Sequence, residues 1–269
     1  MSAATPSAKI TLAGLAPGVF LLLLAGAPAA DELDDINARE QLVVGVSESS
    51  PPFSYRDKEN GVVGYDVDLA SRVAQQLGVG MKKVSLINAE RIPALQQGLV
   101  DLVATGMTRA ENRKRDIAFS LAYLVSPHKV LVRSDSAIAA VKDIRRLALV
   151  RSASVDAELK QAVPALQIAS FDDYDTCFAA LRARRVDGFL ADELLLLSLA
   201  QRSGSPQDFA LVPDYALPRT AGFGIKKDEP RFTDFVNRTL LELEASGEAA
   251  KIFDRWFAPL PRPFKFRSD

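Results

Sequence analysis

The chain has 269 residues, of which 25% are charged, and its formal net charge at pH 7 is −1. A charge so close to zero leaves no basic face for nucleic acid, and the composition is that of a globular protein. The single cysteine, Cys177, excludes an internal disulfide, and its amphipathic helical surroundings indicate a thiol in the core. A chain of this length forms one or two domains of roughly 100 to 150 residues.

The first thirty residues predict an export signal rather than part of the fold. Lys9 precedes an apolar run at 10–27, and Ala27-Pro28-Ala29 supplies small residues at the spacing that a signal peptidase reads. A retained membrane anchor is the alternative, but proline and glycine inside the run disfavour it, and no cysteine stands nearby for a lipid anchor. We expect residues 1–29 to be removed and the remaining chain to be periplasmic.

After this segment, strand patterns alternate with helix patterns. Residues 42–46 and 84–87 are short apolar runs typical of buried strands, and Gly64-Tyr65-Asp66 opens an amphipathic helix that ends at Gly78. Strands that alternate with helices at this spacing indicate βαβ units and a mostly parallel sheet.

The stretch from residue 91 to residue 123 carries the first candidate site. A helix pattern leads into a buried strand at 102–104, which ends in a turn with Gly106 and Thr108, and Arg113 follows five residues later. A backbone carbonyl, a hydroxyl and a guanidinium fork suit a small zwitterion, because the carbonyl accepts from an ammonium and the other two groups bind a carboxylate. A plain strand-to-helix turn with a solvated arginine is equally compatible with this stretch alone.

The pattern Ala-Leu, four residues, Val-Asp occurs at 94–101 and again at 180–187, and a strand pattern follows each copy. Gly106 stands five residues after the first copy and Asp192 five residues after the second. A four-residue match can arise by chance, but the matching sequels favour two similarly built α/β lobes. Each lobe then has a polar candidate at the carboxyl end of a strand, where open α/β sheets bind ligands.

The second half repeats the alternation of strands and helices. Ser152-Ala153-Ser154 precedes a helix pattern, and such hydroxyl residues either cap the helix or leave its N–H groups free for a carboxylate. Crossings near 122–126 and 218–222 predict a two-strand hinge between the lobes. Further strands are expected at 129–132, 147–150 and 166–168, and helices at 173–184, 194–200, 232–245 and 248–257, the last two returning to the first lobe.

Several motifs, in the same order, resemble the polar-amino-acid (family three) solute-binding proteins that serve ABC importers. They are GYDVDLA at 64–70, RIPAL at 91–95, GMT at 106–108 with Arg113, and Phe119-Ser120 before Tyr123, and the resemblance covers residues 42–257. More narrowly, ESS at 48–50, PFSY at 52–55 and SGEA at 246–249 with Trp256-Phe257 resemble the glutamate/aspartate-binding branch.

The resemblance implies an α/β, two-lobed periplasmic-binding-protein fold, each lobe a mostly parallel sheet flanked by helices. Lobe 1 would comprise 30–124 and 220–269, and lobe 2 would comprise 125–219. The family's roles carry over to six residues of this sequence. Arg113 and Thr108 would hold the α-carboxylate, the Gly106 carbonyl and Asp192 would receive the α-ammonium, and Ser152 and Ser154 would close over the carboxylate.

The pocket for the ligand side chain is less closely matched. Ser50 and Asn88 occupy positions where many relatives have aromatic walls, so the pocket is expected to be polar. Arg91 is a candidate to face an acidic ligand side chain, and a structural role is equally compatible. Ser47 stands where the acidic-amino-acid branch has an arginine, and Gly106-Met107 replaces a more hydroxyl-rich turn, so the sequence leaves the bound amino acid open.

The function implied by the resemblance is capture of a polar amino acid, most nearly glutamate or aspartate, by lobe closure, followed by delivery to an ABC permease. The protein would be a monomer without cofactor, metal or catalytic residues. One alternative is an exported dehydratase-like enzyme on the same fold, with an acid such as Glu193 or Glu48. Another is a ligand-binding sensor for a membrane receptor. A single histidine, His128, and a single cysteine exclude most nucleophilic arrangements.

Overall fold

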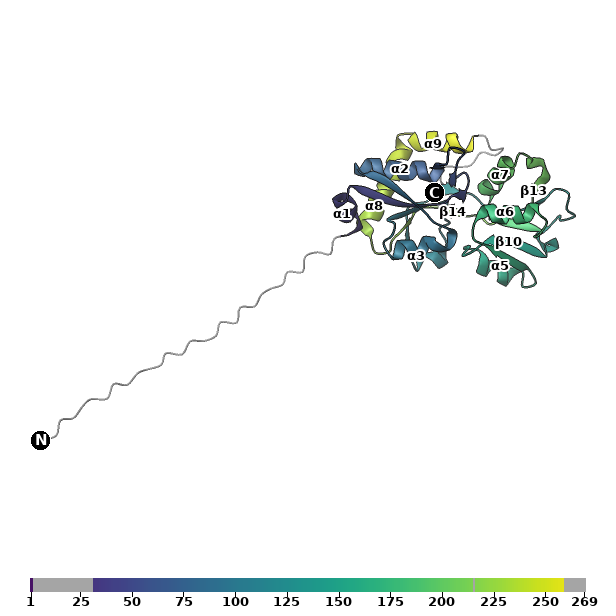
Figure 1. Cartoon of the computed structure of the whole chain (residues 1–269), viewed down its shortest axis with the longest axis horizontal. Helices are drawn as coiled ribbons and strands as arrows, with labels where there is room; N and C mark the ends of the chain where they lie inside the picture. Colours follow the sequence, from purple (N-terminus) through teal and green to yellow (C-terminus); the bar gives the residue numbers. More distant parts are fainter. Residues whose placement is uncertain (2–30, 215, 259–269) are drawn as a thin grey trace.

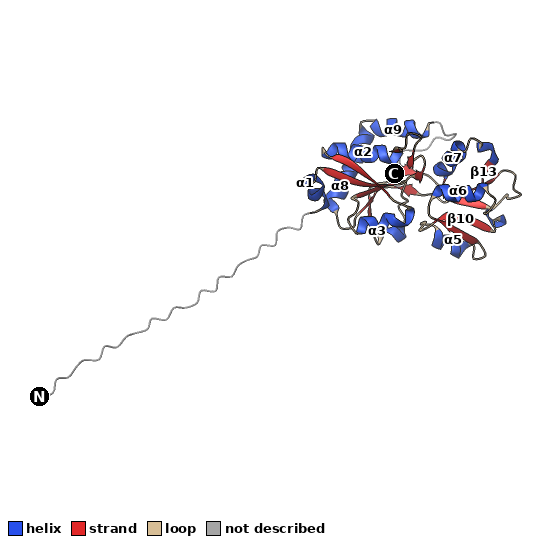
Figure 2. Ribbon diagram, viewed as in Figure 1, coloured by secondary structure: helices blue, strands red, loops and turns tan. Residues whose placement is uncertain are grey.

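The computed structural model of the protein describes residue 1, residues 31–214 and residues 216–258 (Figure 1). Apart from Met1, the predicted export signal lies outside the described residues. Within the described ranges, none of the helices combines the length and the hydrophobicity needed to span a membrane. This part of the chain forms two lobes, and each is a sheet with helices packed around it (Figure 2).

The first lobe is built on a five-stranded sheet in the order β5-β1-β6-β15-β7. Its strands β5 and β6 run parallel to the central β1, and β15 pairs antiparallel with both β6 and β7. The bounds are β1 Gln41–Val46, β5 Gly80–Ser85, β6 Leu102–Ala104, β7 Ala118–Phe119 and β15 Gly224–Ile225. Its helices are α1 Glu32–Ala38, α2 Tyr65–Leu77, α3 Arg91–Gln96, α4 Glu111–Lys114, α8 Pro230–Ala245 and α9 Glu248–Phe257, with the 3₁₀ turn η1 Asn88–Glu90.

The second lobe repeats the same order with β11-β10-β12-β9-β13. Here β11 and β12 run parallel to β10, and β9 pairs antiparallel with β12 and β13. The bounds are β9 His128–Arg133, β10 Arg146–Val150, β11 Gln167–Phe171, β12 Gly188–Asp192 and β13 Phe209–Leu211. The helices are α5 Asp156–Ala162, α6 Tyr174–Arg182 and α7 Glu193–Arg202, with the 3₁₀ turns η2 Val141–Asp143 and η3 Pro206–Asp208.

The repeat in the sequence therefore corresponds to a repeat in the fold. The two Ala-Leu…Val-Asp patterns lead into β6 and β12, which hold the same place in the two sheets. The apolar runs of β1 and β10 are buried because helices cover the sheets, as parallel sheets require. Cys177, on the buried side of α6, is fully buried and forms no disulfide, which confirms the prediction of a core thiol.

Two short strands connect the lobes where the sequence predicted the crossings. β8 (Leu124–Val125) pairs antiparallel with β14 (Thr220–Ala221), so the chain passes between the lobes through a two-strand hinge. The helices α8 and α9, which follow the second crossing, pack on α2 of the first lobe, as predicted. The exact lobe boundaries at 124/125 and 219/220 stay a prediction.

Some predicted bounds were wrong. β5 ends at Ser85 instead of spanning 84–87, because it is an edge strand whose largely exposed residues have no continuous apolar run. The helix after Ser152-Ala153-Ser154, whose apolar pattern predicted that it contains Val155, begins only at Asp156, and Val155 is its N-cap without a side-chain hydrogen bond to it. The serine hydroxyls therefore do not cap α5. The remaining strands, β2 Ser49–Ser50, β3 Ser54–Arg56 and β4 Val62–Val63, form a small antiparallel sheet beside α2.

Candidate functional site

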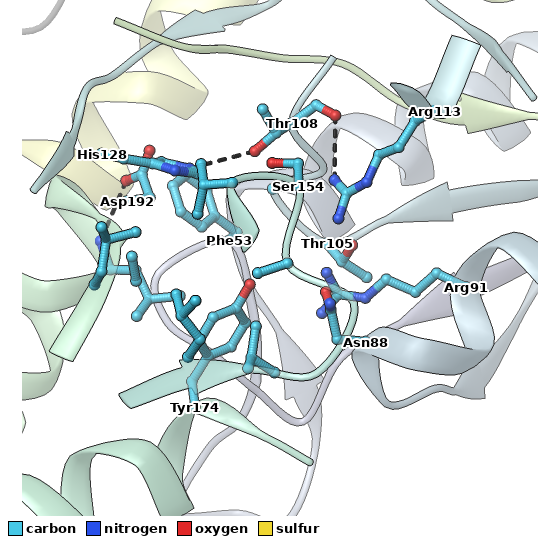
Figure 3. Close-up of a pocket in the computed structure, with 18 residues that line it drawn as sticks. Phe53, Asn88, Arg91, Thr105, Thr108, Arg113, His128, Ser154, Tyr174 and Asp192 are labelled. Carbon is cyan, nitrogen blue, oxygen red and sulfur yellow. Dashed lines mark hydrogen bonds between the residues drawn. The ribbon is translucent and has the colours of Figure 1, made fainter. Parts of the chain in front are cut away.

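A narrow cavity of about 30 Å³ lies between the two lobes, where the carboxyl ends of β6, β10 and β12 meet. Both lobes contribute to its wall, and its polar side chains point inward from several different elements (Figure 3). This is the position at which α/β sheets bind ligands. Seven of the nine residues predicted for the site line the cavity: Asn88, Arg91, Gly106, Thr108, Arg113, Ser154 and Asp192.

The other two predicted residues do not line the cavity. Ser50 is fully buried, and its Oγ accepts a hydrogen bond from Arg91 Nη2 at 3.4 Å. Ser152 contributes its backbone carbonyl, which accepts from Arg113 Nη2 at 3.1 Å. Contact of either side chain with a ligand stays a prediction, and the geometry favours a supporting position for both.

Arg113, on α4, is held in place by backbone carbonyls. Its Nη1 donates to Thr108 O at 3.2 Å, and its side chain is only 8% exposed. Burial, reinforced by the positive charge of Arg91, lowers the pKa of Arg113 to about 10. The group remains charged at neutral pH and keeps N–H donors for a carboxylate.

Arg91, on α3, is even more deeply buried, at 2% exposure. Burial lowers its pKa, while the Tyr174 hydroxyl and the charge of Asp66 favour the charged form. Its Nε has no hydrogen-bond partner among the described residues. Within the same residues, no carboxylate lies within 4 Å of the guanidinium of Arg91 or of Arg113.

The turn after β6 is fixed from beneath by Asp66. Its Oδ2 accepts from Gly106 N at 2.6 Å and from the Tyr123 hydroxyl at 2.5 Å. Burial raises the pKa of Asp66 to about 6, against the effect of these hydrogen bonds. Gly106 has φ +65°, and a Cβ there would come within 2.6 Å of the Phe53 ring, which also lines the cavity. The turn therefore requires glycine.

Asp192 ends β12 and begins α7. Its Oδ1 accepts from Leu194 N at 2.8 Å and from Leu195 N at 3.4 Å, so the carboxyl group caps the helix while lining the cavity. Burial raises its pKa to about 7, although the helix N–H groups act in the opposite direction. The second lobe thus brings one carboxyl group to the wall opposite Arg91 and Arg113.

Four polar or aromatic residues of the wall were not predicted from the sequence: Phe53, Thr105, His128 and Tyr174. His128 Nε2 lies 3.4 Å from Thr108 Oγ1. Burial, with the charges of Arg219 and Arg113, lowers the pKa of His128 to about 3. His128 Nδ1 and Thr105 Oγ1, like Arg91 Nε, are buried without a partner among the described residues. The only sequence feature that could have singled out His128 is that the chain has no other histidine.

Hydrogen bonds cross the cleft around this cavity. Asn88 Nδ2 donates to Arg151 O at 2.5 Å, and Asn112 Nδ2 donates to Ser154 O at 3.5 Å. Between the same two lobes, Tyr174 N donates to Ser49 Oγ at 3.3 Å. The two lobes are therefore in contact. In the described part of the chain, no group of three or more His, Cys, Asp or Glu side chains is arranged to hold a metal ion.

Known proteins share this fold along most of their length. The glutamate/aspartate import solute-binding protein of Salmonella typhimurium is 29% identical over 251 residues, which cover 88% of this chain and 83% of that protein. A solved mutant of ArgBP from T. maritima has a TM-score of 0.78 at 29% identity, covering 84% of this chain and 99% of that one. The ancestral amino acid-binding protein AncCDT-1, a precursor of cyclohexadienyl dehydratase, has a TM-score of 0.77 at 28% identity, with coverage of 84% and 99%.

These likenesses confirm the resemblance seen in the sequence and the two-lobed binding-protein fold. The family model for bacterial extracellular solute-binding proteins, family 3, matches residues 42–259, from the first strand of the first lobe to the end of α9. This protein belongs to the bacterial extracellular solute-binding proteins of family 3.

Proposed function

We propose that the protein captures an acidic amino acid, glutamate or aspartate, between its lobes and delivers it to the permease of an ABC importer. The observation that carries this proposal is the pair of buried guanidinium groups, Arg91 and Arg113, which line one cavity without a carboxylate within 4 Å among the described residues. A buried guanidinium group without a carboxylate in direct contact is costly. Two carboxylates of one ligand would offset that cost.

The charges of the wall match an acidic amino acid. Arg91 and Arg113 contribute two positive charges, and an ionised Asp192 contributes one negative charge, so the wall carries +1. Glutamate carries −1 at neutral pH, glutamine carries none, and arginine carries +1. Asp66 lies beneath the turn and reduces the field at Arg91. An acidic ligand is therefore favoured over a neutral one, and a cationic ligand is disfavoured.

The proposed roles follow those expected from the resemblance. Arg113 and Thr108 hold the α-carboxylate, and the Gly106 carbonyl and Asp192 hold the α-ammonium. Arg91 takes the side-chain carboxylate, with Asn88 and Tyr174 beside it. Ser47 stands where the acidic-amino-acid branch has an arginine, so Arg91 is the cation left for this carboxylate. The deep burial of Arg91 fits that role.

The names of the relatives support an amino acid as ligand but differ in which one. The Salmonella protein is named for glutamate and aspartate, whereas ArgBP from T. maritima was solved in an arginine-bound form. The proposed choice of ligand therefore rests on the residues that line this chain's own cavity. The buried cation Arg91 at the side-chain end is unfavourable for an arginine ligand and favourable for a carboxylate.

We further propose that the protein is a carrier and not an enzyme. AncCDT-1 shows that a related binding protein preceded a dehydratase, so the enzyme alternative has a specific basis. The low pKa of His128, about 3, keeps its ring uncharged at neutral pH, so no imidazolium is present to act as a general acid. Cys177 is fully buried outside the cavity, and burial raises the pKa of its thiol. Recovery of unchanged ligand after prolonged incubation is the expected result.

We propose export to the periplasm through the segment at 1–29, a monomeric state, and lobes bounded at 124/125 and 219/220. Delivery to a permease and docking on a receptor would use the same closed form. Copurification with the permease subunits, but not with a membrane receptor, is the result expected for an importer.

A binding screen tests the ligand directly. The purified protein is titrated with L-glutamate, L-aspartate, L-glutamine, L-arginine and glutarate, and its melting temperature is measured in each case. A ligand that binds only the folded state raises this temperature by mass action. We expect the largest shift with an acidic amino acid. A larger shift with L-arginine, or no shift with any amino acid, would contradict the proposal.

A further inference from the structure

His128 lies between two groups that the proposed function assigns to the ligand. In the register of β9 and β12, His128 pairs with Asp192, so the two side chains project from the same face of the sheet. On its other side, His128 Nε2 lies 3.4 Å from Thr108 Oγ1 (Figure 3). The imidazole therefore spans the distance between the expected carboxylate and ammonium positions of a bound amino acid.

The two ring nitrogens have different surroundings. Nε2 has the Thr108 hydroxyl beside it, whereas Nδ1 is buried and has no partner among the described residues. Burial, together with the charges of Arg219 and Arg113, keeps this ring uncharged, so one nitrogen carries a proton and the other carries a lone pair. If Nε2–H donates to Thr108 Oγ1, the hydroxyl is directed to donate to the ligand carboxylate, and Nδ1 is left as an acceptor.

An α-ammonium group has three N–H donors and binds best when three acceptors surround it. The Gly106 carbonyl and Asp192 account for two. We propose that His128 Nδ1 is the third acceptor, so that the site selects ligands with a primary α-ammonium group. This inference rests on the proposed function, since it needs an amino acid at Arg113 and Thr108.

The single histidine makes the test direct, because the only imidazole ¹⁵N signals of the protein come from His128. The protein is labelled with ¹⁵N-histidine, purified with a tag that contains no histidine, and titrated with L-glutamate. We expect a neutral ring protonated at Nε2, with an Nδ1 resonance that moves upfield as L-glutamate binds. Protonation at Nδ1 in the bound state, or an Nδ1 resonance unchanged by saturating L-glutamate, overturns the inference.

Substitution supplies a second, independent measurement. His128→Ala removes the acceptor, and His128→Asn places an amide oxygen near the position of Nδ1. For L-glutamate, we expect His128→Ala to weaken binding about tenfold or more and His128→Asn to restore most of it, because a hydrogen bond to a charged donor is lost and replaced. Binding of glutarate, which lacks the ammonium, is expected to stay within about twofold in both variants. Melting temperatures near that of the unsubstituted protein exclude misfolding as the cause.

The outcomes separate this inference from the proposed function. If the unsubstituted protein binds none of the amino acids in the screen, both are overturned. If it binds L-glutamate but His128→Ala weakens L-glutamate and glutarate equally, His128 only supports the fold of the site, and this inference alone fails. An unchanged affinity of His128→Ala for L-glutamate would also overturn this inference alone.

Discussion

The guanidinium groups of Arg91 and Arg113 lie in the same cavity, close enough for the charge of Arg91 to lower the pKa of Arg113 further than burial alone. The two residues come from separate helices, α3 and α4, on either side of β6. Among the described residues, no carboxylate within 4 Å offsets this repulsion at either group. Two like charges held together in a buried site are a cost to the fold, and an anionic ligand would relieve it.

Arg91 is expected to decide between acidic and amide ligands. In Arg91→Gln, the affinity for L-glutamate should fall by about 2–5 kcal/mol, because its side-chain carboxylate would be buried without a cation. The affinity for L-glutamine should change little, and the preference between the two ligands should reverse. Isothermal titration of both ligands measures this. An equal loss for both would assign Arg91 a purely structural role.

Arg113 is expected to be required for every amino acid. Arg113→Ala should lower the affinity for L-glutamate and L-glutamine alike by at least about 100-fold, since both present the same α-carboxylate. Arg115→Ala is the matched control, because Arg115 is exposed two residues further along the chain. A variant at position 113 that still binds as tightly as the control would show that the carboxylate lies elsewhere.

Amino-acid binding should weaken below pH 7. Burial raises the pKa of Asp192 to about 7, and an α-ammonium binds the ionised carboxylate, so binding lowers this pKa and releases a proton. Affinity is then full above pH 7 and falls by about tenfold per pH unit below it. Titration of L-glutamate between pH 5.5 and 8 tests this, because the ligand's own charges stay constant in that range.

Asp192→Asn provides the control for that pH profile. The variant should bind L-glutamate more weakly than the unsubstituted protein at pH 8, and its affinity should not fall between pH 8 and pH 6.5, above the pKa of Asp66 of about 6. Binding of glutarate, which has no ammonium, should be spared. A profile in the variant that still falls below pH 7 would place the titrating group elsewhere, and His128 is excluded at these pH values because its pKa lies near 3.

Gly106 and Gly98 form a matched pair for testing the turn. Both have left-handed backbones, with φ +65° and φ +66°, but a Cβ at Gly98 would meet nothing within 4 Å. Gly98→Ala should lower the free energy of unfolding by about 1 kcal/mol and leave binding unchanged. Gly106→Ala should cost more than this and weaken L-glutamate binding, because the added Cβ displaces Phe53. Urea unfolding of both variants measures the loss of stability, and ligand titration measures the loss of affinity.

Much of the fold could be predicted from the sequence because local patterns carried it. The apolar runs of β1 and β10 and the amphipathic face of α2 are signals that neighbouring residues suffice to produce. The bounds of the edge strand β5 were predicted only in part, since its exposed residues show no apolar run. The start of α5 was misplaced because serines that usually cap a helix lie ahead of it in a loop, with Ser152 at φ +59°.

The candidate site was predictable only where a motif carried it. Arg113, Thr108 and Gly106 share one turn, so their proximity follows from the chain itself. Tyr174 and His128 belong to the same cavity, yet neither stands in a pattern that indicates a ligand. Tyr174 reaches Arg91 only because the lobes close, and His128 stands beside Asp192 only because β9 pairs with β12.

The sequence by itself therefore determined the alternation of strands and helices, the repeated lobe, the crossings of the hinge and the residues on one wall of the cleft. Those features depend on local periodicity and on short motifs. The tertiary structure decided that Arg91 and Arg113 share a buried cavity, that Ser50 stands behind Arg91, and that His128 lies between Thr108 and Asp192. These relationships depend on strand order and lobe contact, which bring together residues far apart in the chain and remove their charges from water.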